Sequence, residues 1–234
     1  MVPVVKDKQG NLGDVSNYRG ITISPMLTKI FEHALKLLFS DYLTTSPLQF
    51  GFKKKHSTSH AIHCLKETVN YYINNGNRVY CSLLDASKAF DRLVHTGLFL
   101  KMMDKGFPKL FIDIIVTWYD GLFCRVLWDG AYSDWFPVLA GVRQGRVLSP
   151  DFYGLYVDEL IAILIASGVG CYYISRFAAA LMYADDLIIL APTLKGLQCL
   201  LSLCESYCKK WDIILNPCKT KTSSLAKARR PLVF

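Results

Sequence analysis

The segment from residue 177 to residue 192, FAAALMYADDLIILAP, is apolar almost throughout but carries two adjacent aspartates, Asp185 and Asp186, near its centre. A buried carboxylate is costly unless it is protonated, paired or bound to a metal ion, and two neighbouring carboxylates also repel each other. One alternative is a turn whose carboxylates point into water. In a continuous strand the two side chains would point to opposite faces, so they can converge only if the chain turns there. The segment therefore predicts two strand-like arms, 178–182 and 187–190, joined by a tight turn.

A hairpin tip with two carboxylates is half of a site for a hard cation. Mg²⁺ takes oxygen ligands, usually one or two carboxylates together with substrate phosphates. The segment VYCSLLDASKAFDRL offers a third carboxylate, because Asp85 ends a β-rich run over 79–84. Three carboxylates from two strands could hold two Mg²⁺ ions ~4 Å apart, which serve phosphoryl transfer. The alternative for Asp85 is a helix N-cap after a strand, and the alternative for Asp91 is a solvated or capping residue.

Apolar periodicity and capping residues predict the helices. The ranges are 25–39, 57–76 with Ser57-Thr58-Ser59 as the cap, 110–119, a helix that begins at Ser149-Pro150, and 194–211. Strands are predicted over 78–84 and 212–215, and Asp129-Gly130 is a strong turn signal between the runs 122–128 and 132–139. Strands and helices alternate without G-x-x-x-x-G-K-[ST] or G-x-G-x-x-G, so the usual nucleotide-binding loops are absent from the sequence.

The composition is that of a globular chain with a basic excess. With 234 residues, 52% of them hydrophobic, the chain is one large domain or two small ones. A formal net charge of +8 suggests a polyanionic partner, although many basic proteins bind none. The eight cysteines form no C-x-x-C pair, the N-terminus lacks the apolar core of a signal peptide, and the run 160–168 is too short to span a bilayer. We therefore expect an intracellular protein, in the cytoplasm, the nucleus or both, with no membrane partner.

The order of the segments is more informative than any one of them. LLDASKAFD, then GVRQGRVLSP, then YADD resembles the ordered motifs of reverse transcriptases. NYRGITISPMLTKIFE and QFGFKKKHST precede these motifs and LNPCKTK follows them. The combination is similar to the non-LTR (LINE-type) retrotransposon branch of that family and extends from about Val4 to Lys221. YADD alone is weak evidence, whereas five or six motifs in order are very specific.

The resemblance implies a mixed α+β (α/β) fold, the fingers and palm of a right-hand polymerase. An antiparallel palm sheet would pack on helices, and no thumb would be present. The implied segments are fingers over 1–78, palm with the first catalytic aspartate over 79–104, a fingers or palm helix and hairpin over 105–140, palm with the YADD hairpin over 141–225, and a tail over 226–234 that includes the basic run KARR.

The resemblance also implies the roles of the acidic residues. Asp85, Asp185 and Asp186 match the catalytic carboxylates, which hold two Mg²⁺ ions, with Mn²⁺ as the substitute ion. Ala86 would lend its backbone carbonyl to a metal ion. Lys219 in LNPCKTK matches a lysine near the pyrophosphate leaving group and is a candidate general acid.

Nucleotide-binding residues are implied in the same way. Phe90 matches the aromatic steric gate that excludes a 2′-hydroxyl, although by itself it reads as a core residue. Gln144 and Gly145 match the loop that touches the incoming nucleotide, where glycine permits close backbone approach. Arg19 and Lys29 match basic positions of the fingers that grip the triphosphate, and their alternative is a solvated surface charge.

Residues for the primer and template follow. Tyr183 begins the hairpin, where the primer end would rest. The run expected to contact the template backbone, with a solvated turn as its alternative, is Lys53, Lys54 and Lys55. His56 in this run and Arg146 after the Gln-Gly pair depart from the family pattern. Arg146 is either tolerated, in contact with phosphate, or the mark of a decayed copy.

The sequence thus predicts an RNA-directed DNA polymerase domain that extends a primer 3′-hydroxyl with dNTPs. Its partners would be an RNA template and a DNA primer, and a full-length element protein would add endonuclease and thumb regions. Without a thumb, we expect the chain alone to be weak or inactive. The alternative is a catalytically decayed relic or a nucleic-acid-binding module of the same fold. An unrelated Mg²⁺-dependent phosphotransferase fails because no other phosphate-binding loop is found.

Overall fold

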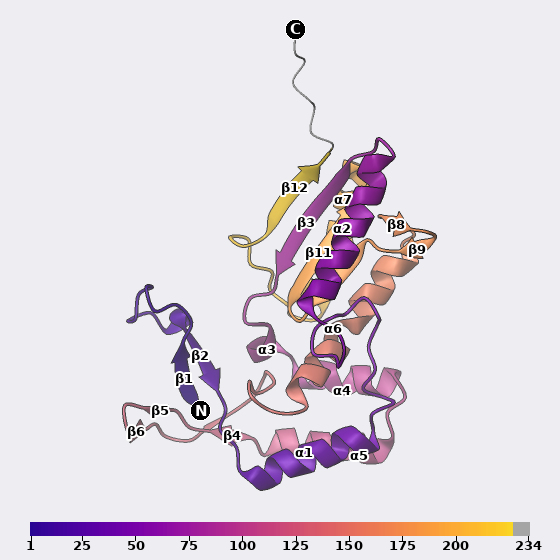
Figure 1. The fold of residues 1–234 in the computed structure, drawn as a ribbon. Coiled ribbons are helices and arrows are strands. Elements are labelled where there is room, and N and C mark those ends of the chain that lie inside the picture. The colour runs from indigo at the N-terminus through magenta and orange to yellow at the C-terminus, as the bar shows by residue number, and fades with distance from the viewer. Residues whose placement is uncertain (227–234) are drawn as a thin grey trace. The chain divides into compact units, whose positions relative to one another are not determined.

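The computed structural model describes residues 1–226, and the chain divides into two compact units (Figure 1). Unit 1 comprises Met1–Thr44 and Phe90–Tyr156, and unit 2 comprises Thr45–Ala89 and the chain from Val157 onward. Each unit is therefore assembled from two separate stretches of sequence. The tail with the run KARR lies outside the described residues apart from Ala226, which precedes it.

Unit 2 is built on a four-stranded antiparallel sheet with the strand order β10-β11-β3-β12. The strands are β3 (Val79–Asp85), β10 (Ala180–Tyr183), β11 (Asp186–Ala191) and β12 (Lys221–Leu225). The centre of the sheet is apolar and fully buried, with Ile189, Leu190 and Ala191 at 0% exposure. The predicted antiparallel sheet, with β10 and β11 as its hairpin arms, is confirmed.

Two helices cover this sheet. Helix α7 (Leu194–Lys210) contacts β11 and β3, and α2 (Thr58–Asn74) contacts β10 and β3. The buried residues of α7 recur at helical spacing, and its N-cap Thr193 accepts a hydrogen bond from the Gly196 backbone N–H at 3.0 Å. Ser57 stands at the N-cap position of α2, but its side chain makes no capping hydrogen bond. A short hairpin, β8 (Tyr172–Tyr173) and β9 (Arg176–Phe177), completes unit 2.

Unit 1 is mainly helical around an aromatic core. Its helices are α1 (Met26–Leu38), α4 (His95–Asp104) and α5 (Lys109–Asp120). Phe111 and Phe152 are buried at this core, with ring centroids 6.5 Å apart. Helix α6 (Ser149–Ala166) begins in unit 1 and ends in unit 2, and the short α3 (Ala89–Arg92) also crosses the boundary. No helix in residues 1–226 is long and apolar enough to cross a membrane.

Small hairpins complete unit 1. The first joins β1 (Val2–Val5) to β2 (Tyr18–Ile21), with the 3₁₀ turn η1 (Val15–Asn17) between them. The second is β4 (Phe123–Cys124) with β7 (Phe136–Pro137), which continues as β5 (Leu127–Trp128) with β6 (Ala131–Tyr132). Asp129 and Gly130 have positive φ angles of 46° and 78°, which suit the turn of a two-residue hairpin. The hairpin predicted around these two residues is confirmed.

One predicted strand is wrong. Residues 212–215 form no strand, because Asp212 has a φ of +52° and turns the chain, so that only Leu215 makes an isolated bridge to Ala86. The strand that joins the sheet comes later, as β12, whose sequence KTSSL gave no strand signal. It lies at the sheet edge and pairs only with β3, so it needs no apolar alternation. The predicted helices over 25–39, 110–119 and 194–211 are confirmed as α1, α5 and α7, within one residue at either end.

Candidate functional site

Strand register brings the three predicted carboxylates to one end of the unit 2 sheet. Tyr183 pairs with Asp186 across the hairpin, so the two-residue turn consists of Ala184 and Asp185, and Ala184 has a φ of +58°. Asp186 is also directly opposite Asp85 in the β11–β3 ladder. Directly opposed residues of an antiparallel pair lie on the same face with their Cβ atoms ~5 Å apart. Asp85 and Asp186 therefore face each other, and Asp185 lies in the adjoining turn.

The three carboxylates repel one another, and Lys219 forms an ion pair with one of them, Asp85. The pKa of Asp186 is raised by partial burial first and then by the negative charges of Asp185 and Asp85, while Lys219 lowers it. Lys219 Nζ donates to Asp85 Oδ1 at 3.1 Å. The Asp85 side chain is only 15% exposed, whereas that of Lys219 is 65% exposed. The lysine is the one cation that the structure places against these carboxylates within residues 1–226.

The donor set fits a hard divalent cation in kind, because three carboxylates supply oxygen ligands and concentrated negative charge. Burial raises the pKa of Asp186 most, and the charges of Asp185 and Asp85 raise it further, so a bound cation would relieve part of this cost. Within the described part of the chain, however, no three His, Cys, Asp or Glu side chains are gathered into an arrangement that could hold a metal ion. The three carboxylates therefore lie at the same end of the sheet, but their side chains are not arranged around a common point where a metal ion would bind.

The turn of the hairpin is braced by a residue that the sequence did not single out. Gln49 is 2% exposed, and its Oε1 accepts hydrogen bonds from the backbone N–H groups of Gly51 at 2.9 Å and Ala184 at 3.2 Å. The backbones meet as well, since Phe50 N–H donates to the Met182 carbonyl at 2.7 Å. A Cβ on Gly51 would lie 2.3 Å from the Ala184 nitrogen, so only glycine fits. The signal was present in the motif QFGF, whose glutamine and glycine both have this structural role.

A second loop brings Lys219 to Asp85. The backbone N–H of Asn216 donates to the Asp85 carbonyl at 2.8 Å, and that of Ser87 donates to the Ile214 carbonyl at 2.7 Å. Asn216 Oδ1 accepts from the Cys218 N–H at 3.0 Å, which fixes the turn that precedes Lys219. The same loop pairs Leu215 with the buried Ala86. The lysine is therefore held at the carboxylates by the backbone that follows α7.

Of the three lysines in the run 53–55 of unit 2, one forms hydrogen bonds within its own loop and two are exposed. Lys53 Nζ donates to the Thr45 carbonyl at 2.9 Å and also to the Ser46 carbonyl, so this ammonium ties its own loop together. Lys54 and Lys55 are exposed, and Lys55 has a φ of +63°. The two exposed lysines remain predicted template contacts, and Lys53 has a structural part as well.

The predicted nucleotide-binding residues lie in unit 1. Phe90 is stacked on Tyr153, with ring centroids 5.0 Å apart and ring planes 18° apart. Gln144 Nε2 donates to Asp91 Oδ1 at 3.1 Å, and the Gln144 carbonyl accepts from the Thr22 N–H at 2.8 Å. Asp91 is exposed, in agreement with a solvated residue, and its carboxylate also accepts this hydrogen bond from Gln144.

For the other three predicted nucleotide-binding residues, Gly145, Arg19 and Lys29, the structure shows backbone contacts or an exposed side chain. Gly145 has a φ of +98°, and a Cβ there would lie 3.2 Å from the Thr22 carbonyl oxygen. Arg19 on β2 and Lys29 on α1 are exposed, and neither has an ion-pair partner among residues 1–226. Their roles remain predictions.

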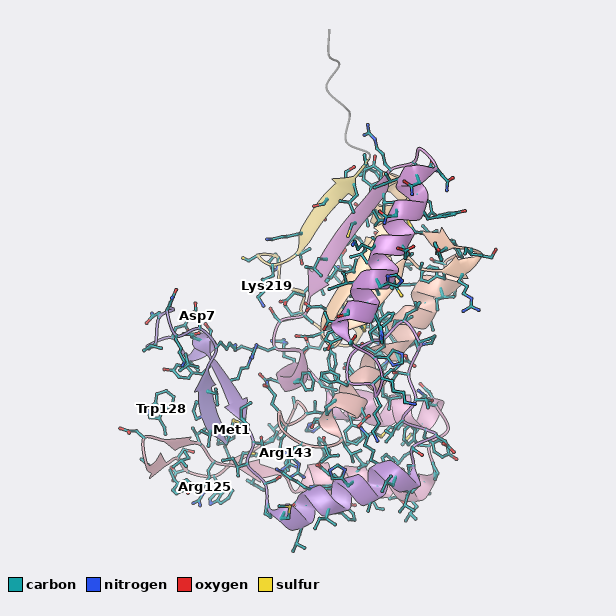
Figure 2. All side chains as sticks on the ribbon, in the orientation of Figure 1. Met1, Asp7, Arg125, Trp128, Arg143 and Lys219 are labelled. Carbon is teal, nitrogen blue, oxygen red and sulfur yellow. The ribbon has the colours of Figure 1, made fainter. Side chains whose placement is uncertain are left out.

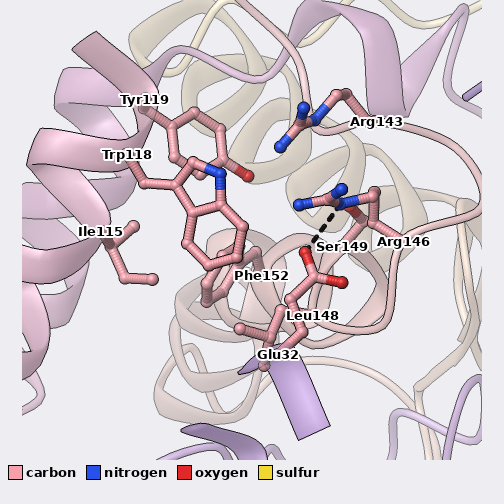
Figure 3. Close-up of a pocket in the computed structure, with 9 residues that line it drawn as sticks. All are labelled: Glu32, Ile115, Trp118, Tyr119, Arg143, Arg146, Leu148, Ser149 and Phe152. Carbon is pink, nitrogen blue, oxygen red and sulfur yellow. Dashed lines mark hydrogen bonds and ion pairs between the residues drawn. The ribbon is translucent and has the colours of Figure 1, made fainter. Parts of the chain in front are cut away.

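Arg146 turns into the interior of unit 1 (Figure 3). Its Nε donates to Glu32 Oε1 at 2.8 Å, and the Val147 N–H donates to Glu32 Oε2 at 2.8 Å. The Arg146 guanidinium lies 5.2 Å from the centre of the Trp118 ring. Both charged side chains are buried, at 3% and 6% exposure. The departure from the family pattern is therefore accommodated by a carboxylate on α1, which the sequence did not mark because the two residues lie far apart in the chain.

Comparisons with known proteins agree on one family. Residues 5–231 match the family described as "Reverse transcriptase (RNA-dependent DNA polymerase)". The chain is 29% identical over 218 residues to the probable RNA-directed DNA polymerase from transposon BS of Drosophila melanogaster, with 87% of this chain and 23% of that protein covered. It is 30% identical over 222 residues to a retrovirus-related Pol polyprotein from type-1 retrotransposable element R2 of Nasonia vitripennis, with 95% and 22% covered.

The fold also has solved counterparts. An apo telomerase from Candida Tropicalis, truncated from its C-terminal domain, superposes with a TM-score of 0.57 at 18% identity, over 84% of this chain and 41% of that one. This likeness supports the right-hand polymerase fold and nothing further. The chain spans about a quarter or less of the length of the curated relatives named above.

Proposed function

The chain belongs to the reverse transcriptase (RNA-dependent DNA polymerase) family, in its non-LTR (LINE-type) retrotransposon branch, and from this premise we propose that it is the polymerase segment of a longer retrotransposon protein. The proposed reaction extends a primer 3′-hydroxyl with dNTPs on an RNA template. One observation carries the proposal: Asp186 is paired with Asp85 in the sheet, and Asp185 lies in the adjoining turn. Like charges that lie directly opposite each other destabilise a sheet, and a cation bound between the carboxylates would offset this repulsion.

Asp85, Asp185 and Asp186, with the Ala86 carbonyl, are the proposed ligands of two divalent cations, Mg²⁺ or in its place Mn²⁺. Such ions, when bound, activate an attacking hydroxyl and stabilise the leaving oxygen of a displacement at phosphorus. Lys219 carries its proton at Nζ, within 3.1 Å of Asp85 Oδ1. As the proposed general acid, it would give that proton to the pyrophosphate oxygen that leaves.

The remaining site residues orient the substrates in this proposal. Phe90 would exclude a 2′-hydroxyl, Gln144 and Gly145 would line the path of the incoming nucleotide, and Arg19 and Lys29 would bind its triphosphate. In unit 2, Tyr183 would support the primer end, and the run Lys53, Lys54 and Lys55 would contact the template backbone. The clustered positive charges suit contact with phosphates, which depends on charge and not on base sequence.

The wider setting is part of the proposal. The relatives named above are roughly four times as long as the matched segment, which leaves room for thumb and endonuclease regions in the whole protein. All eight cysteines are free thiols in the structure, which supports a reducing compartment, the cytoplasm or the nucleus.

The test is primer extension on poly(rA)/oligo(dT) with Mg²⁺, read as the first few nucleotides added by the 234-residue chain. Asp85→Asn and Asp185→Asn should each reduce extension to background, because they remove ligand charge from the proposed metal site. The matched control is Glu205→Gln, which removes one negative charge from the exposed face of α7, where Glu205 pairs only with Lys209 among the described residues.

Circular dichroism should be unchanged in all three variants. Extension near the wild-type level in either aspartate variant would refute the metal-site assignment. A wild-type chain that adds no nucleotide at all, although folded, would favour the alternative of a decayed relic or a binding module.

A further inference from the structure

Unit 1 contains a cavity of about 410 Å³ that the predicted polymerase residues do not line. It is bounded by the segment after β2, by the end of α5 and by the β4–β6 hairpin strands, and Figure 2 labels Arg125 and Arg143 from its lining. A volume of this size lies within the range of small-molecule sites, about 300–1,000 Å³. Arg19, Lys29, Phe90, Gln144 and Gly145 are all absent from the lining.

The lining of this cavity is strongly basic. Three arginines contribute to it, Arg125, Arg143 and Arg146, and no Asp or Glu of the described residues does. Glu32 forms an ion pair with Arg146, whereas neither Arg125 nor Arg143 forms an ion pair with a carboxylate within residues 1–226. The pKa of Arg143 is lowered by burial and by the neighbouring Arg146, which is the effect expected where guanidinium groups, still protonated, crowd together. Figure 3 shows these two guanidinium groups side by side.

Three residues that line the same cavity each have a polar side-chain atom without a hydrogen-bond partner among the described residues. Arg146 Nη2, Thr22 Oγ1 and Ser24 Oγ are buried and have no hydrogen-bond partner among the described residues. Arg146 is 6% exposed and Thr22 is 8% exposed. Buried polar atoms of this kind are uncommon and costly unless a further group satisfies them. Because these atoms are buried, an anion in the cavity would become their partner only after the side chains turn toward it.

Aromatic rings stand at the rim. The Arg125 guanidinium lies 3.8 Å from the centre of the Tyr132 ring and 4.8 Å from that of the Trp135 ring, so it contacts both rings. Tyr132 and Trp135 are nevertheless 58% and 62% exposed. Exposed rings next to arginines provide the stacking surface that single-stranded nucleic acids use.

We propose that this pocket binds a nucleotide unit, with its phosphate on Arg125 and Arg143 and its base against Tyr132 and Trp135. The unit comes either from a single strand or from a free nucleotide, since both present the same base and phosphate. The pocket is a binding site additional to the polymerase carboxylates, and the inference does not rest on the proposed polymerase activity.

The test measures binding in EDTA to the full chain carrying Asp85→Asn and Asp185→Asn, so that the polymerase residues of unit 2 are disabled. Quenching of tryptophan fluorescence is a direct readout, because Trp118 and Trp135 line the cavity. The probes are AMP, an adenosine ribohexanucleotide, adenosine and inorganic phosphate. AMP and the hexanucleotide should bind at least about 10-fold more tightly than adenosine or phosphate, because each of these lacks one half of the recognised unit.

Arg125→Gln and Arg143→Gln should each weaken AMP binding by about 10-fold or more. The matched control is Arg176→Gln, an exposed arginine on β9 of unit 2, which should bind as the parent does. A hexanucleotide that binds much more tightly than AMP identifies a strand as the ligand, and equal affinities identify a free nucleotide. No binding of either, equal binding of inorganic phosphate, or an equal loss in all three arginine variants would overturn the proposal.

Discussion

The two units hold their site residues by different means. In unit 2, the carboxylates are placed by backbone register, through the β10–β11 hairpin and the β3 ladder. In unit 1, two of the predicted nucleotide-binding residues have side-chain contacts that support them, Phe90 with Tyr153 and Gln144 with Asp91. A carboxylate can therefore be replaced without loss of the sheet, whereas a substitution in unit 1 changes the site and its support together.

The largest expected effect is that of Glu32→Ala. It leaves the buried Arg146 guanidinium without its carboxylate, a change that typically costs about 3–5 kcal/mol. Unit 1 should then unfold at lower denaturant concentration, as followed by tryptophan fluorescence, because Trp118, Trp128 and Trp135 all lie in this unit. Hydrogen exchange in peptides of β11 should change much less.

A double variant provides the control for this prediction. Glu32→Met combined with Arg146→Met replaces the ion pair with apolar side chains of similar length, which is often nearly neutral or even stabilising. Its stability should exceed that of Glu32→Ala. If Glu32→Ala unfolded at the wild-type denaturant midpoint, the claim that unit 1 depends on the contact between Glu32 and Arg146 would be wrong.

Phe90→Ala should have the next largest effect. Truncation of a buried phenylalanine costs about 3–5 kcal/mol, and a half-buried ring such as Phe90 should cost about half of that. If the ring also excludes the 2′-hydroxyl, incorporation of ribonucleotides relative to deoxynucleotides should rise in primer extension. Phe90→Tyr, which keeps the stacked ring, is the matched variant. Unchanged sugar selectivity in a folded Phe90→Ala protein would make Phe90 a core residue alone.

Gly145→Ala comes third. The residue would have to adopt a φ of +98°, and its methyl group would lie 3.2 Å from the Thr22 carbonyl, so we expect a loss of about 1–3 kcal/mol. Gly76→Ala in unit 2 is the control, since Gly76 has a φ of +79° but nothing within 4 Å of an added Cβ. Its cost should be limited to the backbone strain, about 1–2 kcal/mol. Equal losses in urea unfolding would show that the contact with Thr22 contributes nothing.

The smallest effect is that of Asp186→Asn on the metal-free protein. Because the pKa of Asp186 is raised in the fold, the folded state binds its proton more readily than the unfolded state does. The contribution of this group to stability is therefore present at pH values below its unfolded pKa and is lost as the pH rises through its folded pKa. Asp186→Asn should then be slightly more stable than the parent at pH 7 and should lose that advantage in acid. Melting curves of both proteins between pH 3 and pH 7 in EDTA measure this difference, and an Asp186→Asn variant that is less stable than the parent at pH 7 would contradict the prediction.

The elements that the sequence predicted correctly, in both units, are those with local signals. The apolar arms on either side of Asp185 and Asp186 define the hairpin, and Thr193 caps the helix that follows. Strand β12 was missed because an edge strand with one partner needs no apolar pattern. Its pairing depends on β3 and on a contact between Ser82 Oγ and Thr222 Oγ1 at 3.0 Å, which only the fold creates.

Residues that act across the chain were not predictable from local pattern. Glu32 sits among charged and apolar residues of a helix and resembles a surface residue until Arg146 meets it. Gln49 likewise acts on Ala184, which lies 135 positions later. In both cases the partner is selected by tertiary contact, and no periodicity or capping rule refers to it.

The close fit of Gly51 against the Ala184 amide has an evolutionary consequence. Any side chain at position 51 would meet the backbone of the turn 2.3 Å away, so a substitution there displaces Asp185 without any change to the YADD motif itself. If the proposed polymerase function is correct, a sequence can keep every aspartate and still lose activity, so position 51 should be examined together with the YADD motif.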